Sequence, residues 1–149
     1  LCAGVEQLSD LQSKPLLPLL TGLTAVEARR RLDREAPPQL RLPTGREVMI
    51  RYAEGEAPRV QVKLQALFGL ATHPCVGPQR SVPIQLELLA PNQRITQVTT
   101  DLPGFWRGSY HEVRRSLRGR YPKHPWPEDP LSAEATELSK KQLARRRET

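Results

Sequence analysis

The chain has little cysteine and no long apolar run. Only Cys2 and Cys75 occur among its 149 residues, which is too few for a disulfide framework and typical of the reducing cytoplasm. No apolar stretch approaches the roughly 18 residues of a membrane span, and the richest, residues 16–23, is interrupted by Pro18 and Gly22. No signal peptide is recognisable. We therefore expect a cytoplasmic protein that does not contact a membrane.

The motifs of a nucleotide-binding enzyme are also missing. The chain has neither a Gly-x-x-x-x-Gly-Lys-Ser/Thr phosphate loop nor a dinucleotide-binding glycine pattern. His73 and Cys75 could be metal ligands, but the other candidates, His111, His124 and Cys2, lack the spacing of a tetrahedral site. We therefore expect no catalytic residue, no metal ion and no cofactor within this chain.

Positive charge is what the chain has in excess. Its formal net charge of +7 and pI of 10.0 favour an acidic partner such as nucleic acid, although many proteins are basic merely for solubility. The length is that of one domain with a sizeable core. Because the sequence begins at Leu1 without an initiator Met, we expect a processed protein or a fragment of a longer one.

Residues 1–36 are predicted to be mostly helical. Apolar residues recur at helical spacing near the start, and Pro15 and Pro18 then interrupt the register. The Thr-Ala-Val-Glu sequence at 24–27 is a capping box, and it predicts a second helix from there to about Glu35, before a pair of prolines. Together these signals indicate an N-terminal helical hairpin.

Residues 40–100 change to the alternating pattern of strands. Residues 48–52 and 60–64 alternate on both sides of a turn-rich connector, which predicts a β-hairpin. Further strands are predicted at 82–89 and, after a turn, at 95–99. Weaker signals indicate a short strand and one helical turn, at residues 40–42 and 65–68. We expect a small, mostly antiparallel sheet.

Two short helices are predicted after the sheet. Asp101 is a good cap for the first, and the Ser-Tyr-His-Glu sequence from Ser109 is a capping box that opens the second, which Gly119 ends. The apolar stripe of the second helix consists of Tyr110, Val113 and Leu117. The other side carries His111, Arg114, Arg115 and Arg118. The second helix is therefore amphipathic, with one face that packs and one that shows charge.

The C-terminal part divides into a stiff segment and a basic one. Residues 121–130 contain four prolines, which predicts an extended strap across the surface. Residues 131–149 contain few apolar anchors, so we expect a basic, flexible tail. Its cations are Lys140, Lys141, Arg145, Arg146 and Arg147. They would either add salt-dependent affinity for nucleic acid or simply keep the chain in solution.

Aromatic rings and fixed positive charges alternate between Asp101 and Pro130. Such a stretch can stack on bases and neutralise phosphates, or it can dock on an acidic, partly apolar protein surface. The candidate contact residues are Arg114, Arg115, Arg118, Arg120 and Lys123. A solvated helix face, neutralised by acids such as Glu128 and Asp129, is the third interpretation of these cations.

The aromatic residues of this stretch have two interpretations each. Trp126 could be presented for stacking on a base, but prolines beside a tryptophan more often fix the ring against its own domain. Phe105 and Trp106 are expected in the core, where they would seal the first of the two helices against the sheet.

Several runs in the chain closely resemble the C-terminal region of bacterial HrpB-type DEAH-box helicases. The most specific is RYPKHPWPEDP at residues 120–130, and DLPGFW at 101–106, PTGR at 43–46 and LQALFGL at 64–70 extend the likeness over about residues 36–130. The resemblance implies a parent that is an ATP-dependent RNA helicase. It also implies that ATP and magnesium are bound by motor domains outside this chain.

We therefore predict an α+β accessory domain, residues 37–130, flanked by the helical segment 1–36 and the tail. The resemblance implies that it packs on the motor domains of the same parent chain, with RNA as a further partner. The alternative is a docking module that stabilises the motor and never contacts nucleic acid.

Overall fold

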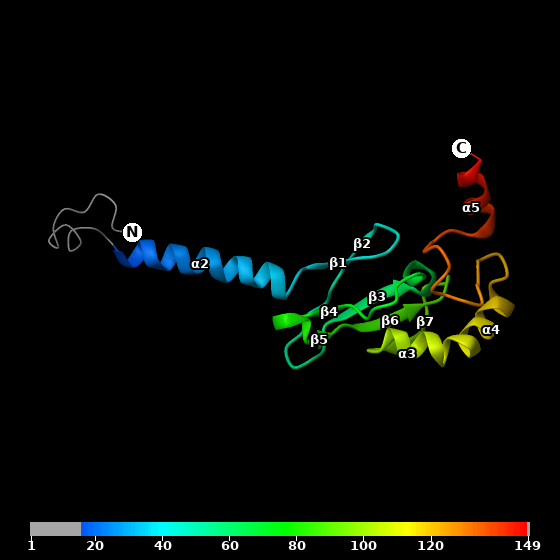
Figure 1. The fold of residues 1–149 in the computed structure, drawn as a ribbon, viewed down its shortest axis with the longest axis horizontal. Helices are drawn as coiled ribbons and strands as arrows, with labels where there is room; N and C mark the ends of the chain where they lie inside the picture. Colours follow the sequence, from blue (N-terminus) through cyan, green and yellow to red (C-terminus); the bar gives the residue numbers. More distant parts are fainter. Residues whose placement is uncertain (1–15, 149) are drawn as a thin grey trace.

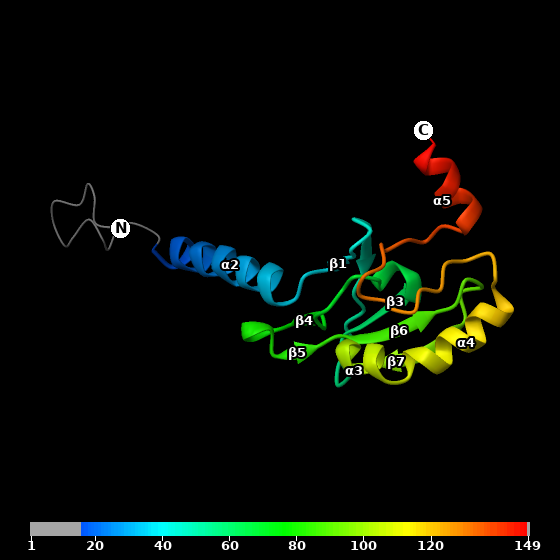
Figure 2. The same ribbon diagram turned by 45° about the vertical axis from the view of Figure 1, so that its right-hand side comes forward.

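The computed structural model describes the backbone of residues 16–148 and the side chains from Ala25 onward. It confirms the α+β class: short strands in three small sheets form the centre of a body that helices flank. Helix α2 projects from one end of this body, and helix α5 stands at the other (Figures 1 and 2). None of the described helices is long and apolar enough to cross a membrane.

Helix α2 (Leu16–Glu35) is one continuous helix. The predicted start at the capping box of residues 24–27 is wrong, because that sequence lies inside the helix. Pro18 is tolerated because it occupies the first turn, where a backbone N–H has no acceptor within the helix. The predicted end at Glu35 is confirmed. The first helix of the expected hairpin lies outside the described residues.

Strands β1 (Gln39–Arg41) and β2 (Glu47–Met49) form an antiparallel hairpin. The predicted hairpin between residues 48–52 and 60–64 is found only as an isolated antiparallel bridge between Arg51 and Arg59, next to the predicted connector, among the described residues. Alternation in a sequence fixes which side chains of a strand share a face, but it does not select the neighbouring strand.

The central sheet has the order β3–β6–β7. Its strands are β3 (Arg59–Lys63), β6 (Gln85–Leu89) and β7 (Ile95–Thr99). The β6–β7 pair is antiparallel, which confirms the predicted return strand, whereas β3 and β6 are parallel. Val60 lies opposite Leu86 in this parallel pair, and both side chains are fully buried. Because the β1–β2 and β4–β5 pairs are antiparallel too, the prediction of mostly antiparallel pairing is confirmed.

A long crossover connects β3 to β6, as a parallel pair requires. It contains the short helices η1 (Leu64–Leu67) and η2 (Pro78–Arg80) and the strands β4 (Cys75–Val76) and β5 (Val82–Pro83). The predicted strand at 82–89 is therefore two strands, β5 and β6. His73 fastens the crossover: its Nδ1 accepts from the N–H of Leu102 at 3.1 Å, and its Nε2 donates to the Ile84 oxygen at 2.8 Å.

Helices α3 (Leu102–Arg107) and α4 (Tyr110–Arg120) run along the sheet (Figures 1 and 2). The predicted cap of α3 is confirmed, since Asp101 Oδ1 accepts from the N–H of Gly104 at 3.0 Å. The predicted capping box at Ser109 is wrong: its backbone is already helical, and its side chain accepts no capping bond. Helix α4 also continues through Gly119.

The core contains a cluster of aromatic rings. Tyr110 and Trp106 meet edge to face, with ring centroids 5.3 Å apart and planes at 81°. Phe68 and Phe105 also contact both rings. Trp106 Nε1 donates to the Leu70 oxygen at 2.9 Å. All four rings are buried, which confirms the prediction that Phe105 and Trp106 belong to the core.

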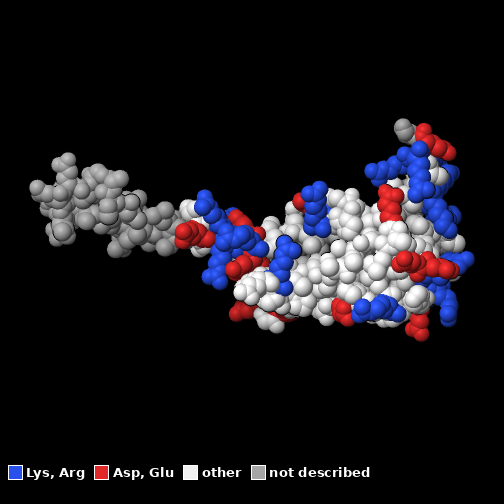
Figure 3. Space-filling model, viewed as in Figure 1, with Lys and Arg blue, Asp and Glu red and all other residues white. Residues whose placement is uncertain are grey.

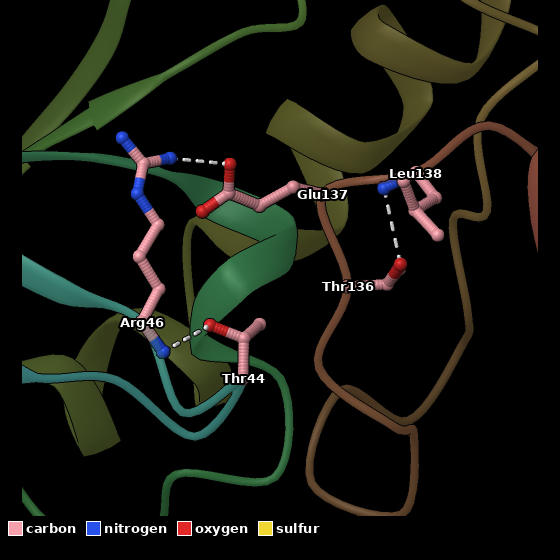
Figure 4. Close-up of polar contacts among 5 residues, drawn as sticks. All are labelled: Thr44, Arg46, Thr136, Glu137 and Leu138. Atoms are coloured by element: carbon pink, nitrogen blue, oxygen red, sulfur yellow. Dashed lines mark hydrogen bonds and ion pairs between the residues drawn. The ribbon is translucent and has the colours of Figure 1, made fainter.

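Residues 121–139 return over the body without helix or strand. The N–H of Thr136 donates to the Gln65 oxygen at 3.0 Å, and Arg46 forms an ion pair of 2.6 Å with Glu137 (Figure 4). Ser139 then caps α5 (Lys140–Arg147) in a capping box with Gln142. The described part of the predicted tail thus contacts the domain through Thr136 and Glu137 and ends in α5.

Candidate functional site

The apolar stripe predicted for α4 is confirmed, and it sets the orientation of the helix. Tyr110 and Leu117 are buried, and Val113 packs partly buried against the same core. Because these side chains face the body, the basic residues one or two positions away face outward. Arg115 and Arg118 are exposed, and neither forms an ion pair with a described residue.

Arg114 differs from its two neighbours. Its side chain is only 18% exposed, its Nε donates to the Trp126 oxygen at 2.9 Å, and its guanidinium lies 3.4 Å from Glu128 Oε1. This arginine therefore fastens α4 to residues 126–128 of its own chain. Of the predicted contact residues, Arg114 is the one whose side chain forms a hydrogen bond and an ion pair with described residues.

The remaining two candidate residues lie apart from this face. Arg120 lines a separate hollow together with Arg94 and Ile95, on the side of α4 that faces the β6–β7 turn. Lys123 follows α4 in the chain, and its main-chain oxygen accepts from the N–H of Lys140 at 2.8 Å. The five predicted cations thus lie in different places: Arg114, Arg115 and Arg118 line one hollow on α4, Arg120 lines another, and Lys123 follows the helix.

A groove of about 540 Å³ runs between α4, residues 125–128, residues 133–136 and α5. The cations that line it are Arg114, Arg118, Lys140 and Arg147. Two carboxylates, Glu128 and Glu134, also line it, so cations exceed carboxylates by two (four minus two). In Figure 3, Lys and Arg gather at this end of the molecule, along α5 and beside α4. We call this the α4–α5 groove.

Sequence reasoning missed that α5 contributes to this site. The predicted flexible tail includes residues 140–147, which form α5 in the structure, and Lys140 and Arg147 of this helix line the same groove as Arg118. One signal could have located the helix. The Ser-Lys-Lys-Gln sequence beginning at Ser139 has the form of a capping box, and the structure forms both of its bonds.

Trp126 lies at the floor of the groove rather than on its rim. The residue is only 7% exposed, and its Nε1 donates to the Tyr121 oxygen at 2.8 Å. The structure therefore favours the packing interpretation of this ring over the stacking one. The preceding residue, Pro125, is also held in place, because its main-chain oxygen accepts a hydrogen bond from Gln65 Nε2 at 3.0 Å.

Two titratable groups near the groove are perturbed by burial. Burial raises the pKa of Tyr110 to about 12, with Arg114 lowering it and Asp129 raising it as smaller effects. The hydroxyl donates to the Pro127 oxygen at 2.7 Å, so it is a neutral structural donor. Burial lowers the pKa of His124, and Lys63 adds to this effect. No hydrogen bond joins either side chain to a second titratable side chain among the described residues, as an acid–base pair would require.

The described residues hold no group of three or more His, Cys, Asp and Glu side chains that could bind a metal ion. Both ring nitrogens of His73 are used in hydrogen bonds to the main chain. What the site offers is an array of guanidinium and ammonium groups beside a partly apolar groove. The charge of such an array suits an anion.

The chain matches known proteins over most of its length. A family model described as "ATP-dependent helicase C-terminal" (HrpB_C) matches residues 1–130. The "ATP-dependent RNA helicase HrpB" of Escherichia coli (strain K12) is 44% identical over 138 residues, which cover 93% of this chain and 17% of that protein.

Two solved structures are also similar. The crystal structure of the E. coli DExH-box NTPase HrpB matches with a TM-score of 0.72 and 44% identity, over 91% of this chain and 17% of that one. The crystal structure of the Escherichia coli DEAH/RHA helicase HrpB matches with a TM-score of 0.54 and 43% identity, over 84% and 16%. The chain spans about a sixth of the length of these relatives. It belongs to the HrpB family of ATP-dependent helicases, and it corresponds to their C-terminal region.

Proposed function

We propose that this chain is the accessory part of an ATP-dependent RNA helicase, that it packs on the motor domains of its parent, and that its α4–α5 groove guides a single RNA strand. ATP and magnesium are bound by the motor domains in this scheme, and the accessory domain supplies no catalytic group. The observation that carries the proposal is the convergence of Arg118, Lys140 and Arg147 on one groove.

The groove suits the phosphate backbone of a nucleic acid better than its bases. Arg118 of the groove and Arg115 in the hollow beside it are exposed and form no ion pair with a described residue, so they are available to replace the counterions of a nucleic acid. The ring of Trp126 is buried and hydrogen-bonded, which argues against stacking and against sequence preference. We therefore expect contacts that follow the strand and do not discriminate between bases.

A salt titration with fluorescein-labelled single-stranded RNA tests this proposal. The logarithm of the affinity should fall linearly with the logarithm of the salt concentration, and replacing Arg118 or Lys140 by Gln should reduce the slope by about 0.7 for each lost contact. Arg30→Gln, an exposed position on α2, is the matched control and should leave the slope unchanged. Equal slopes in all variants would contradict a role for the groove.

The alternative is a docking module that never contacts RNA. Arg114 favours it, because its guanidinium is bonded to the domain's own main chain. This module would show no RNA binding at about 50 mM salt, where sequence-independent contacts are strong, yet would still bind a fragment containing the motor domains. The same titration, run beside a pull-down with that fragment, separates the two functions.

A further inference from the structure

A second cleft of about 540 Å³ lies at the base of α2, at the end of the body away from the α4–α5 groove. Three separate segments form its walls: the end of α2, the β1–β2 hairpin and the crossover from Leu70 to Ile84. Its aliphatic lining includes Leu40, Leu42, Ile50, Leu70, Val76 and Ile84. The volume is within the range of ligand-binding pockets.

Hydrogen bonds between these segments hold the cleft open in one shape. The N–H of Gly77 donates to the Glu35 oxygen at 2.6 Å, which joins the crossover to the end of α2. The Tyr52 hydroxyl donates to the Pro37 oxygen at 2.7 Å, which joins the same end to the hairpin. The walls are therefore fixed to one another, and a ligand would not have to order them on binding.

Three arginines border this apolar cleft: Arg34 from α2, Arg41 from β1 and Arg80 from η2. None of their guanidinium groups forms an ion pair or hydrogen bond with a described residue. Nearby acids do not neutralise them. Glu35 is paired with Arg31 at 3.0 Å, and Glu47, which lies opposite Arg41 in the hairpin, makes no ion pair with it. The cleft therefore combines an aliphatic floor with uncompensated positive charge.

Strand β1 also has an unpaired edge. Its register with β2 places Leu40 opposite Val48, and the bonds Leu42 N–H to the Arg46 oxygen and Ile50 N–H to the Pro38 oxygen show that the even-numbered residues of this strand form the hydrogen-bonded pairs. The main-chain groups of Gln39 and Arg41 therefore point away from β2. Both residues line the cleft.

We propose that this cleft binds an extended, acidic segment of a partner protein. An aliphatic side chain of the segment enters the floor, its carboxylates meet Arg34, Arg41 and Arg80, and its backbone adds to the edge of β1, a known mode of peptide recognition. A nucleic acid fits less well, because no Phe, Tyr or Trp lines the cleft for base stacking. The proposal is independent of any RNA contact by the α4–α5 groove.

A fluorescein-labelled peptide with a central Leu-Ile pair between acidic residues is a suitable probe, read by polarisation. We expect saturable binding that falls about tenfold when Arg41 and Arg80 are both replaced by Glu, and about as much when the peptide's Leu-Ile pair becomes Ser-Ser. Arg107→Glu, at an exposed position at the end of α3, is the matched control and should leave the affinity unchanged. No binding, or equal loss with the control, overturns the proposal.

The thiol of Cys75 gives a second measurement at the same place, since it lines the cleft and forms no disulfide. In a Cys2→Ser background, saturating peptide should slow its alkylation about fivefold or more, because a bound peptide covers the thiol. Single-stranded RNA should not slow it. Protection by RNA and not by the peptide would show that the cleft holds nucleic acid, and would equally overturn the proposal.

Discussion

The Nε atom of Arg114 donates a hydrogen bond to the main-chain oxygen of Trp126 at 2.9 Å. This bond joins the middle of α4 to the proline-rich segment that follows the helix. Arg115, the next residue, is exposed and makes no ion pair with a described residue. Two adjacent arginines therefore have different tasks: one holds the domain together, and the other is available to a ligand.

Replacing Arg114 by Gln should lower the free energy of unfolding by about 1–2 kcal/mol, because the Trp126 oxygen loses a charged donor. Arg115→Gln, one position along the same helix, should change it by less than about 0.5 kcal/mol, as is usual for an exposed residue. Urea denaturation followed by tryptophan fluorescence measures both. Equal effects at the two positions would mean that the bond to Trp126 contributes nothing.

A charge reversal at Arg115 and Arg118 together should weaken RNA binding by the parent roughly tenfold or more at low salt, since two cations become two anions beside the phosphates. The thermal midpoint of unfolding should remain unchanged. RNA-stimulated ATP hydrolysis by the full-length parent gives the functional measurement, and Arg30→Glu on α2 is its control. Unaltered stimulation would remove the outer face of α4 from the RNA path.

Ionisation of Tyr110 should lower the stability of the fold at alkaline pH. Its pKa is raised to about 12, above the ordinary value of 10.0, because burial disfavours the phenolate. Its contribution is therefore complete below about pH 10 and is lost as the pH rises toward 12. Thermal unfolding at several alkaline pH values measures this loss. In Tyr110→Phe the pH dependence should be flatter, at the cost of about 1–2 kcal/mol for the lost bond to Pro127.

Protonation of His124 should lower the stability of the fold at acidic pH. Burial, with a smaller effect of Lys63, lowers its pKa below the ordinary value of 6.5, so the unfolded chain takes up a proton more readily than the folded one. Stability is complete above pH 6.5 and falls as the pH drops below that value. We expect a lower thermal midpoint at acidic than at neutral pH, and a smaller difference in His124→Gln. An unchanged difference would mean that His124 is not the group responsible.

Gly69→Ala should destabilise the domain by roughly 1–2 kcal/mol or more. Its φ of +81° is in the left-handed region that disfavours a Cβ atom, and such an atom would lie 3.3 Å from the Ala133 oxygen. Gly55→Ala is the matched control, because Gly55 has a similar φ of +72° with nothing within 4 Å of the added atom. The difference between the two measures how tightly residues 131–136 pack on the crossover.

Local rules predicted those features that depend on a few neighbouring residues. The cap at Asp101, the helical turn before Gly69 and the amphipathic character of α4 were all confirmed. Strand pairing was predicted less well. No local signal showed that β3 pairs in parallel with β6, because β6 follows only after the whole crossover.

The sequence by itself determined the family, several of the elements and the basic character of α4, because composition, spacing and specific runs are properties of adjacent residues. The tertiary structure alone decided which arginines of α4 have an ion pair within the described part of the domain. It turned Arg114 onto Trp126, brought α5 across the groove from Arg118, and assembled the cleft at α2 from three distant segments. Such contacts depend on long-range packing, in which the partner of a side chain is set by the path of the chain and not by its neighbours in sequence.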